Sequence, residues 1–134
     1  MVCQMSLASA FKGWIGEAVL TVAKKIVLDG DVYRDLNNVT IPTSNGTTQI
    51  DHVFVSRYGI FVIETKNMEG WIFGDEKQPQ WTQSLYGKKF RFQNPLHQNY
   101  RHTKALEEFL ALPASHFHSV VCFVGETCKL KTDL

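Results

Sequence analysis

The sequence predicts one α/β domain, with elements in the order helix, three strands, a β-rich insertion, helix and strand. Apolar residues recur at helical spacing over roughly residues 8–28 and again over about 94–110. A continuous apolar run at 120–124 is typical of a strand buried on both faces. Runs rich in β-branched and aromatic residues, which are typical of strands, lie at about 32–41, 48–56 and 60–66.

Turn and capping residues set the boundaries of these elements. Asp29-Gly30-Asp31 stops the first helix, and Asn45-Gly46 is the strongest turn signal of the chain. Asn94-Pro95 begins the second helix, because Asn caps free N–H groups and Pro suits the first helical position. The β-rich insertion consists of a short strand at 71–73 and a hairpin of 80–86 and 88–92.

Length and composition favour a folded intracellular domain. The chain has 134 residues, of which 44% are hydrophobic and 20% charged, which excludes a disordered chain. We expect a single domain over about residues 8–128, excised from a longer protein, because the sequence stops soon after an apolar strand. The start lacks the pattern of a secretory signal, and no apolar stretch approaches the roughly 20 residues that span a bilayer. A cytoplasmic location is therefore expected.

Three cysteines and a nearly neutral charge limit the function further. The cysteines form no Cys-x-x-Cys pair, so neither a disulfide framework nor a closed zinc site is expected, and a reducing compartment fits best. Cys122 lies in an apolar run and is interpreted as a small core residue. The net charge is +1, so any contact with nucleic acid must come from a local basic patch.

Two acids and a lysine stand at the ends of adjacent predicted strands. Asp51 opens one strand, and Glu64 and Lys66 close the next. Because side chains alternate along a strand, a hairpin loop of two or four residues places all three on one face. Asp51 is then expected opposite Lys66, with Glu64 diagonally beside it. A three-residue loop would break the cluster by turning one strand over.

This grouping suits a metal-dependent nuclease. Asp51 and Glu64 offer the hard oxygen ligands that Mg²⁺ or Mn²⁺ prefers, and the backbone carbonyl of Thr65 is a candidate further ligand. The metal would polarise a phosphodiester and acidify a bound water, while Lys66 would orient that water or stabilise charge on the phosphate. The alternative is a surface Glu–Lys pair beside a strand-end Asp, since a Glu-x-Lys tripeptide occurs often by chance.

Other polar residues are weaker candidates. Gln49 shares a face with Asp51 and can touch a substrate, although a polar strand end is an equal interpretation. His52 points to the other face and is interpreted as structural. Glu17 lies off the apolar stripe of the first helix, either as a solvated residue or as a further acid near the hairpin. Gln98 lies on the opposite side of its helix from Leu96 and can reach a phosphate or a base.

The stretch from Trp81 to Leu106 contains no Asp or Glu and interleaves basic with aromatic residues. Basic side chains meet backbone phosphates and aromatic rings stack on bases, so this stretch is a candidate nucleic-acid contact. The alternative is a solvated hairpin whose aromatic residues face the core. The basic residues assigned to substrate binding are Lys88, Lys89, Arg91, Arg101 and Lys104.

Several segments in this order resemble the nuclease-related domain (NERD) family, within the PD-(D/E)-x-K nuclease superfamily. They are Gly13-Trp14-Ile15-Gly16-Glu17, Gln49-Ile50-Asp51-His52-Val53, the run from Gly59 to Asn67 that ends Glu64-Thr65-Lys66-Asn67, Gly70-Trp71-Ile72-Phe73-Gly74, Trp81, and Asn94-Pro95-Leu96-His97-Gln98-Asn99. The resemblance covers about residues 11–125. Ile50 replaces the proline of the superfamily's first motif, which is not a metal ligand.

The resemblance implies a restriction-endonuclease-like core, with a mixed central β-sheet flanked by helices. It also implies that Asp51 and Glu64 bind metal, that Lys66 is the catalytic lysine, and that Glu17 and Gln98 are auxiliary site residues. We therefore expect a Mg²⁺- or Mn²⁺-dependent endonuclease that hydrolyses phosphodiester bonds, with DNA as its partner, in DNA processing or repair. The alternatives are a nucleic-acid-binding module that does not cut and a protein-interaction domain attached to a processing or signalling enzyme.

Overall fold

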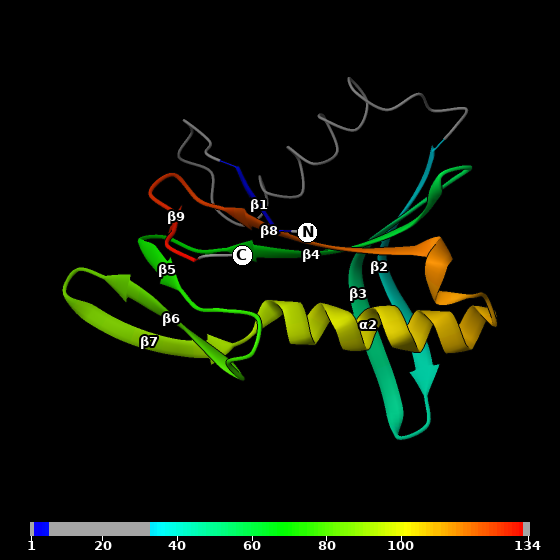
Figure 1. Ribbon diagram of the computed structural model, residues 1–134. Helices are drawn as coiled ribbons and strands as arrows, with labels where there is room; N and C mark the ends of the chain where they lie inside the picture. Colours follow the sequence, from blue (N-terminus) through cyan, green and yellow to red (C-terminus); the bar gives the residue numbers. More distant parts are fainter. Residues whose placement is uncertain (1, 6–32, 133–134) are drawn as a thin grey trace.

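The computed structural model describes residues 2–5 and 33–132 (Figure 1). The predicted helix at 8–28, and with it Glu17, lies outside the described residues. The described elements are β1 (Val2–Met5), β2 (Tyr33–Thr43), β3 (Gly46–Ser56), β4 (Gly59–Asn67), β5 (Trp71–Phe73), β6 (Gln80–Leu85), β7 (Lys88–Gln93), α2 (Pro95–Leu110), the short 3₁₀ helix η1 (Ala114–His116), β8 (Phe117–Val124) and β9 (Lys129–Leu130).

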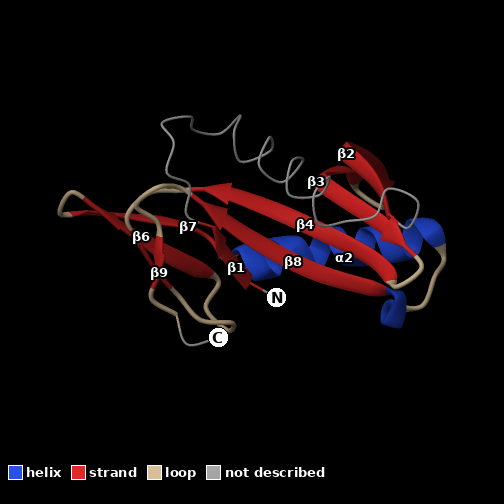
Figure 2. Ribbon diagram, turned by 90° about the horizontal axis from the view of Figure 1, so that it is seen from above, coloured by secondary structure: helices blue, strands red, loops and turns tan. Residues whose placement is uncertain are grey.

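A five-stranded mixed sheet forms the centre of the described fold, in the order β1-β8-β4-β3-β2. The strands β2, β3 and β4 pair antiparallel as two successive hairpins, whereas β8 pairs parallel with both β4 and β1. The two views show α2 running along one face of this sheet, beneath β4 and β8 (Figures 1 and 2). The parallel β4–β8 pair requires a crossover, and β5, β6, β7 and α2 form it.

The β-rich insertion forms a second sheet, in the order β7-β6-β5-β9. The strands β5, β6 and β7 pair antiparallel, and β9 returns after β8 to pair parallel with β5. Figure 1 shows this sheet at one end of α2, with the β6–β7 hairpin projecting outward. The insertion is therefore not a hairpin alone, because a strand from the end of the described chain completes its sheet.

Two hydrophobic clusters hold these parts together. One joins the central sheet to α2 through residues that include Val53, Val62 and Leu106. The other joins the two sheets, and its centre is Trp81, which is fully buried and stacks on Phe123 with ring centroids 6.0 Å apart. A Cβ atom at Gly74 would lie 2.2 Å from the Trp81 ring, so only glycine fits there.

The predicted elements agree with the described structure in kind and differ at several boundaries. The second helix, the three strands that precede the insertion and the strand after α2 are present, and β8 begins three residues before the predicted start at residue 120. The strands β1 and β9 were not predicted. Both are short, and both are held by parallel pairing with distant strands, which leaves little local signal. Among the described helices, none is long and apolar enough to cross a membrane.

The two cysteines of the C-terminal part differ from each other. Cys122 is buried, as its apolar run predicted, but it is disulfide-bonded, which the expected reducing compartment does not favour. Cys128 is also buried, and this burial, assisted by the negative charge of Glu69, raises the pKa of its thiol to about 11.

The raised pKa of Cys128 predicts a loss of stability in alkaline solution. Between its ordinary pKa of 9.0 and about 11, the unfolded chain ionises this thiol while the folded chain keeps it protonated. The stabilisation by the protonated thiol is complete below the unfolded pKa and is lost as pH rises through the folded one. The free energy of unfolding should therefore fall by about 2 kcal/mol by about pH 10.5. Urea unfolding at about pH 8 and about pH 10.5 should show a smaller fall in Cys128→Ala than in the natural chain. An equal fall in both proteins would contradict the assignment.

Candidate active site

The register of the β3–β4 hairpin places Asp51 directly beside Glu64. The hairpin turns at Arg57 and Tyr58, because Ser56 pairs with Gly59, and the paired residues continue to His52 with Ile63. The pairing of the two strands ends there, and one step further along the same register Asp51 stands opposite Glu64. The sequence predicted Lys66 as the direct partner of Asp51, and this is wrong, because the two-residue loop lies one position earlier than that pairing requires.

The different pairing of Asp51 does not separate its side chain from those of Glu64 and Lys66. Moving the loop by one position shifts the pairing by two residues, so Asp51, Glu64 and Lys66 stay on one face. Asp51 also contacts β4 directly, since its Oδ2 atom accepts a hydrogen bond of 3.1 Å from the backbone N–H of Thr65. This bond fixes the carboxylate of Asp51 against the segment that carries Glu64 and Lys66.

Lys66 lies between Glu64 and helix α2. Its Nζ atom is 2.8 Å from Oε1 of Glu64 and donates a hydrogen bond of 2.9 Å to Oε1 of Gln98. Glu64 is buried, with 4% of its surface exposed, whereas the Lys66 side chain is 23% exposed. The ammonium group therefore compensates a buried carboxylate and keeps one side open to solvent. Gln98, assigned to the site by the resemblance, reaches it through this hydrogen bond.

His102 is a site residue that the sequence reasoning missed. Its Nδ1 atom lies 3.7 Å from Oε2 of Glu64 and has no hydrogen-bond partner among the described residues. Burial lowers the pKa of His102, and the negative charges of Glu64 and Asp51 offset part of this effect. The available signal was its spacing, since His102 follows Gln98 by four residues and so lies on the same side of α2.

Two buried asparagines determine where α2 carries Gln98 and His102. The side chain of Asn94 caps the helix, because its Oδ1 atom accepts a hydrogen bond of 2.9 Å from the N–H of Leu96. Asn99 fastens the helix to the central sheet, because its Nδ2 atom donates to the carbonyl of Val62 at 2.9 Å. The same nitrogen lies 3.2 Å from the carbonyl of Val120, on the neighbouring strand.

A pocket of about 480 Å³ opens beside this cluster, between α2 and the turn of the β2–β3 hairpin. Gln98 and His102 line it together with Arg101 and Lys104, two of the basic residues predicted to bind substrate. Lys104 is also paired, since its Nζ atom lies 2.9 Å from Oε2 of Glu107, and this hydrogen bond raises its pKa. The pocket thus holds the cations Arg101 and Lys104 of α2 together with an acid of the same helix, Glu108.

The remaining predicted residues lie farther from these contacts. Gln49 is exposed on β3, opposite Thr40 on β2. His52 is buried and its Nδ1 atom is 2.7 Å from Oδ1 of Asn37, consistent with a structural histidine. Lys88, Lys89 and Arg91 are exposed on β7, in the second sheet.

The donor set fits a small divalent cation in part. Asp51 and Glu64 supply two carboxylates from adjacent strands, and Mg²⁺ is commonly held by one or two carboxylates together with waters and substrate phosphates. Thr65 directly follows Glu64, and its own backbone N–H donates to Asp51, so its carbonyl lies in the same segment of β4. Within residues 2–5 and 33–132, no group of three His, Cys, Asp or Glu side chains forms a protein cage for a metal.

Comparisons with known proteins agree with this arrangement. Residues 12–124 match the model of a family described as the nuclease-related domain. The chain belongs to this family. Membership confirms the resemblance drawn from the sequence motifs and places the domain among nuclease-related domains of the PD-(D/E)-x-K type. Asp51, Glu64, Lys66 and Gln98 all lie within the matched residues.

Among curated proteins, the nuclease-related domain described here is similar to an uncharacterized protein of Bacillus anthracis. The two are 52% identical over 97 residues, which is 70% of this chain and 46% of that protein. The chain thus spans about half the length of this relative. No solved structure matches the chain.

Proposed function

We propose that this nuclease-related domain is a divalent-metal-dependent endonuclease that hydrolyses phosphodiester bonds, with DNA as its substrate. The observation that carries the proposal is the contact between Lys66 and Glu64, 2.8 Å apart, beside Asp51 in the adjacent strand position. A buried carboxylate, a second carboxylate and an ammonium group on one face are the groups that phosphodiester hydrolysis needs.

Each residue has a role that follows from its position. Asp51 and Glu64 would hold Mg²⁺ or Mn²⁺, with the Thr65 carbonyl as a further ligand, and the bound ion would supply charge neutralisation and a more acidic water. The ammonium group of Lys66 places positive charge where a phosphate would approach the carboxylates. Gln98 holds Nζ of Lys66 in place by its hydrogen bond.

Other residues of the proposal act at the edge of the site. Glu17 is proposed as an auxiliary acid, on the basis of its matching motif. Gln49 and the basic residues of β7 and α2 are proposed to bind the substrate, because an approaching polyanion must be met by local positive charge on a chain whose net charge is only +1. The basic residues are Lys88, Lys89, Arg91, Arg101 and Lys104.

Metal binding tests the proposal most directly. Calorimetric titration with Mn²⁺ and with Mg²⁺ should show saturable binding to the natural chain and its loss in the folded Asp51→Ala/Glu64→Ala variant. The loss is expected because both assigned side-chain ligands are removed. Glu126→Ala, which removes an exposed acid remote from the hairpin, is the matched control and should bind as the natural chain does.

Cleavage of labelled DNA by the same proteins completes the test. The natural chain and Glu126→Ala should cut in the presence of metal and stop when it is chelated, whereas the double variant should not cut. Metal binding that survives in the double variant would contradict the assigned ligands. Salt-sensitive DNA binding without any metal-dependent cutting would contradict the enzyme and favour the non-cleaving binding module.

A further inference from the structure

The second sheet has one face packed against the core and one face open. Ile72 and Trp81 point inward and are fully buried. The neighbours of Ile72 on β5, Trp71 and Phe73, point outward and are 50% and 39% exposed. Large aromatic residues seldom stand exposed in adjacent outward positions of a strand without a binding role.

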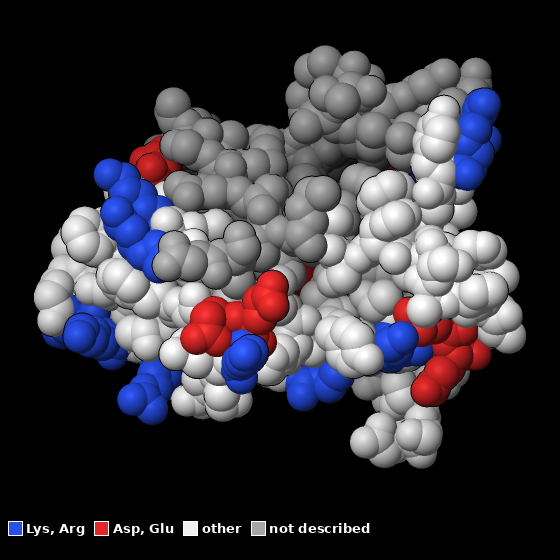
Figure 3. All heavy atoms as spheres, in the orientation of Figure 1, with Lys and Arg blue, Asp and Glu red and all other residues white. Residues whose placement is uncertain are grey.

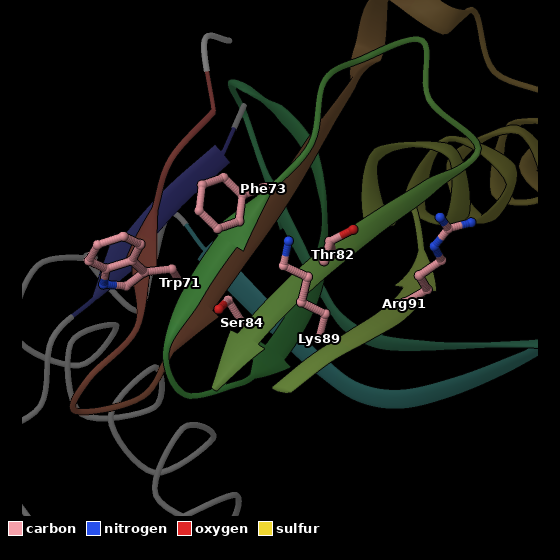
Figure 4. Close-up of a pocket in the computed structure, with 6 residues that line it drawn as sticks. All are labelled: Trp71, Phe73, Thr82, Ser84, Lys89 and Arg91. Atoms are coloured by element: carbon pink, nitrogen blue, oxygen red, sulfur yellow. The ribbon is translucent and has the colours of Figure 1, made fainter. Parts of the chain in front are cut away.

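The open face carries a regular arrangement of side chains. The register aligns Trp71 with Ser84 and Lys89, and it aligns Phe73 with Thr82 and Arg91. Each row thus runs from an aromatic ring on β5, across a small hydroxyl on β6, to a cation on β7. Figure 4 shows these six side chains on the same side of the sheet, where they line a pocket of about 570 Å³.

The charged residues within the strands of this sheet have one sign. None of the strands β5, β6, β7 and β9 contains an Asp or a Glu. Lys129 on β9 is the strand partner of Trp71 on β5. Nζ of Lys131 lies 4.8 Å from the centroid of the Trp71 ring. Cations therefore stand on both sides of the aromatic pair. Figure 3 shows several Lys and Arg side chains at this end of the molecule, with Asp and Glu side chains beside some of them.

We propose that this face, which we call the aromatic platform (Trp71, Phe73, Thr82, Ser84, Lys89 and Arg91), binds single-stranded nucleic acid. Unpaired bases stack on the two aromatic rings, the hydroxyls leave room for them, and Lys89 and Arg91 bind the flanking phosphates. A duplex keeps its bases stacked inside and offers the rings no partner. The proposal rests on the proposed function in one respect, namely that nucleic acid is the substrate.

The platform is continuous with the candidate active site along β7. Gln93 follows Lys89 and Arg91 at the two-residue spacing of one strand face. Gln93 also lines the pocket that contains Gln98 and His102, and α2 begins two residues after it, at Pro95. A nucleic-acid strand bound on the platform can thus pass over Gln93 toward Lys66. The platform would in this way present single-stranded substrate to the candidate active site.

Binding measured without metal separates this proposal from catalysis. A fluorescein-labelled oligothymidylate of about 12 nucleotides is titrated with protein in the presence of a chelator, and its anisotropy is followed. Trp71→Ala/Phe73→Ala should weaken binding at least about tenfold, since two stacking contacts are lost. Lys89→Gln/Arg91→Gln should reduce the slope of log affinity against log salt by about 1.4, or about 0.7 for each phosphate contact removed.

Phe90→Ala is the matched control, because Phe90 is exposed on β7 between Lys89 and Arg91 and points to the opposite side of the strand. It should bind as tightly as the natural chain. Trp71→Phe keeps a stacking ring and should retain most of the affinity, which separates lost stacking from damaged folding. Binding that is unaffected by the aromatic double variant, or equal for duplex and single strand, would overturn the platform. Metal-dependent cutting that persisted in that case would leave the proposed nuclease intact.

Discussion

Replacement of Lys66 by Met should reduce metal-dependent cleavage by about 100-fold or more, the usual effect of removing one charge-stabilising group from an active site. The methionine keeps most of the aliphatic stem and loses the ammonium group that contacts both Glu64 and Gln98. Initial rates of cleavage of a labelled DNA, at saturating metal and equal concentrations of folded protein, measure the effect. Metal binding should persist, because the assigned ligands remain.

The same substitution should also lower stability, and this effect must be separated from catalysis. Without Lys66, the carboxylate of Glu64 stays 4% exposed and loses its nearest cation. Because the Lys66 side chain is partly exposed, the expected cost is roughly 1–3 kcal/mol, between that of a surface pair and that of a buried pair.

A double variant distinguishes the two roles of Lys66. Glu64→Gln/Lys66→Met removes both charges and should recover much of the lost stability while remaining inactive. Lys77→Met, in an exposed loop, is the matched control and should leave both stability and cleavage unchanged. Cleavage at the natural rate by folded Lys66→Met would refute the assigned role.

Strand alternation explains why the sequence could locate the carboxylates and the lysine but not their exact pairing. A period of two residues keeps Asp51, Glu64 and Lys66 on one face for any even shift of register. The choice between Glu64 and Lys66 as the partner of Asp51 depends on whether the turn is centred on Arg57-Tyr58 or one residue later. Local residue preferences do not decide a shift of that size.

The contribution of α2 was harder to predict from sequence. Helical spacing and the Asn94-Pro95 start predicted the helix, but its rotation over the sheet is set by tertiary contacts such as those of Asn99 with Val62 and Val120. Gln98 was therefore only a weak candidate from its place on the helix, and the family resemblance assigned it to the site. His102 carried no recognised motif and was missed.

The predicted basic and aromatic stretch is divided by the structure. Lys89 and Arg91 share the open face of the second sheet, whereas Arg101 and Lys104 line the pocket beside α2. Strand pairing also adds Trp71 and Phe73, from β5, to the first group. These residues lie outside the stretch considered in the sequence, because only the sheet brings β5 next to β6.

Replacement of Asn99 by Asp should destabilise the domain by about 3–5 kcal/mol, the range expected when a buried carboxylate is left without a cation. Asn99 is fully buried, and its amide donates to acceptors on both β4 and β8. A carboxylate in the same place cannot donate and faces the carbonyl oxygens of Val62 and Val120. Urea unfolding followed by circular dichroism measures the loss.

The pH dependence of that loss identifies its cause. Burial raises the pKa of a carboxyl group, so the Asn99→Asp protein should recover stability as pH falls and lose it as pH rises through the raised value. Asn45→Asp is the matched control, because Asn45 is exposed and uses its Oδ1 atom only as an acceptor from Thr43 in the described contact. It should change stability by less than about 0.5 kcal/mol.

The Asn99→Asp protein also tests whether the sheet contacts of α2 support the site. Gln98 and His102 stand on either side of Asn99 in the helix sequence, and both contact residues of β4. If the asparagine sets the position of the helix, cleavage should fall even at temperatures where the variant is folded, and the contact between Gln98 and Lys66 should weaken with it. A variant that is less stable yet cuts at the natural rate when folded would show that β3 and β4 alone position the reacting groups.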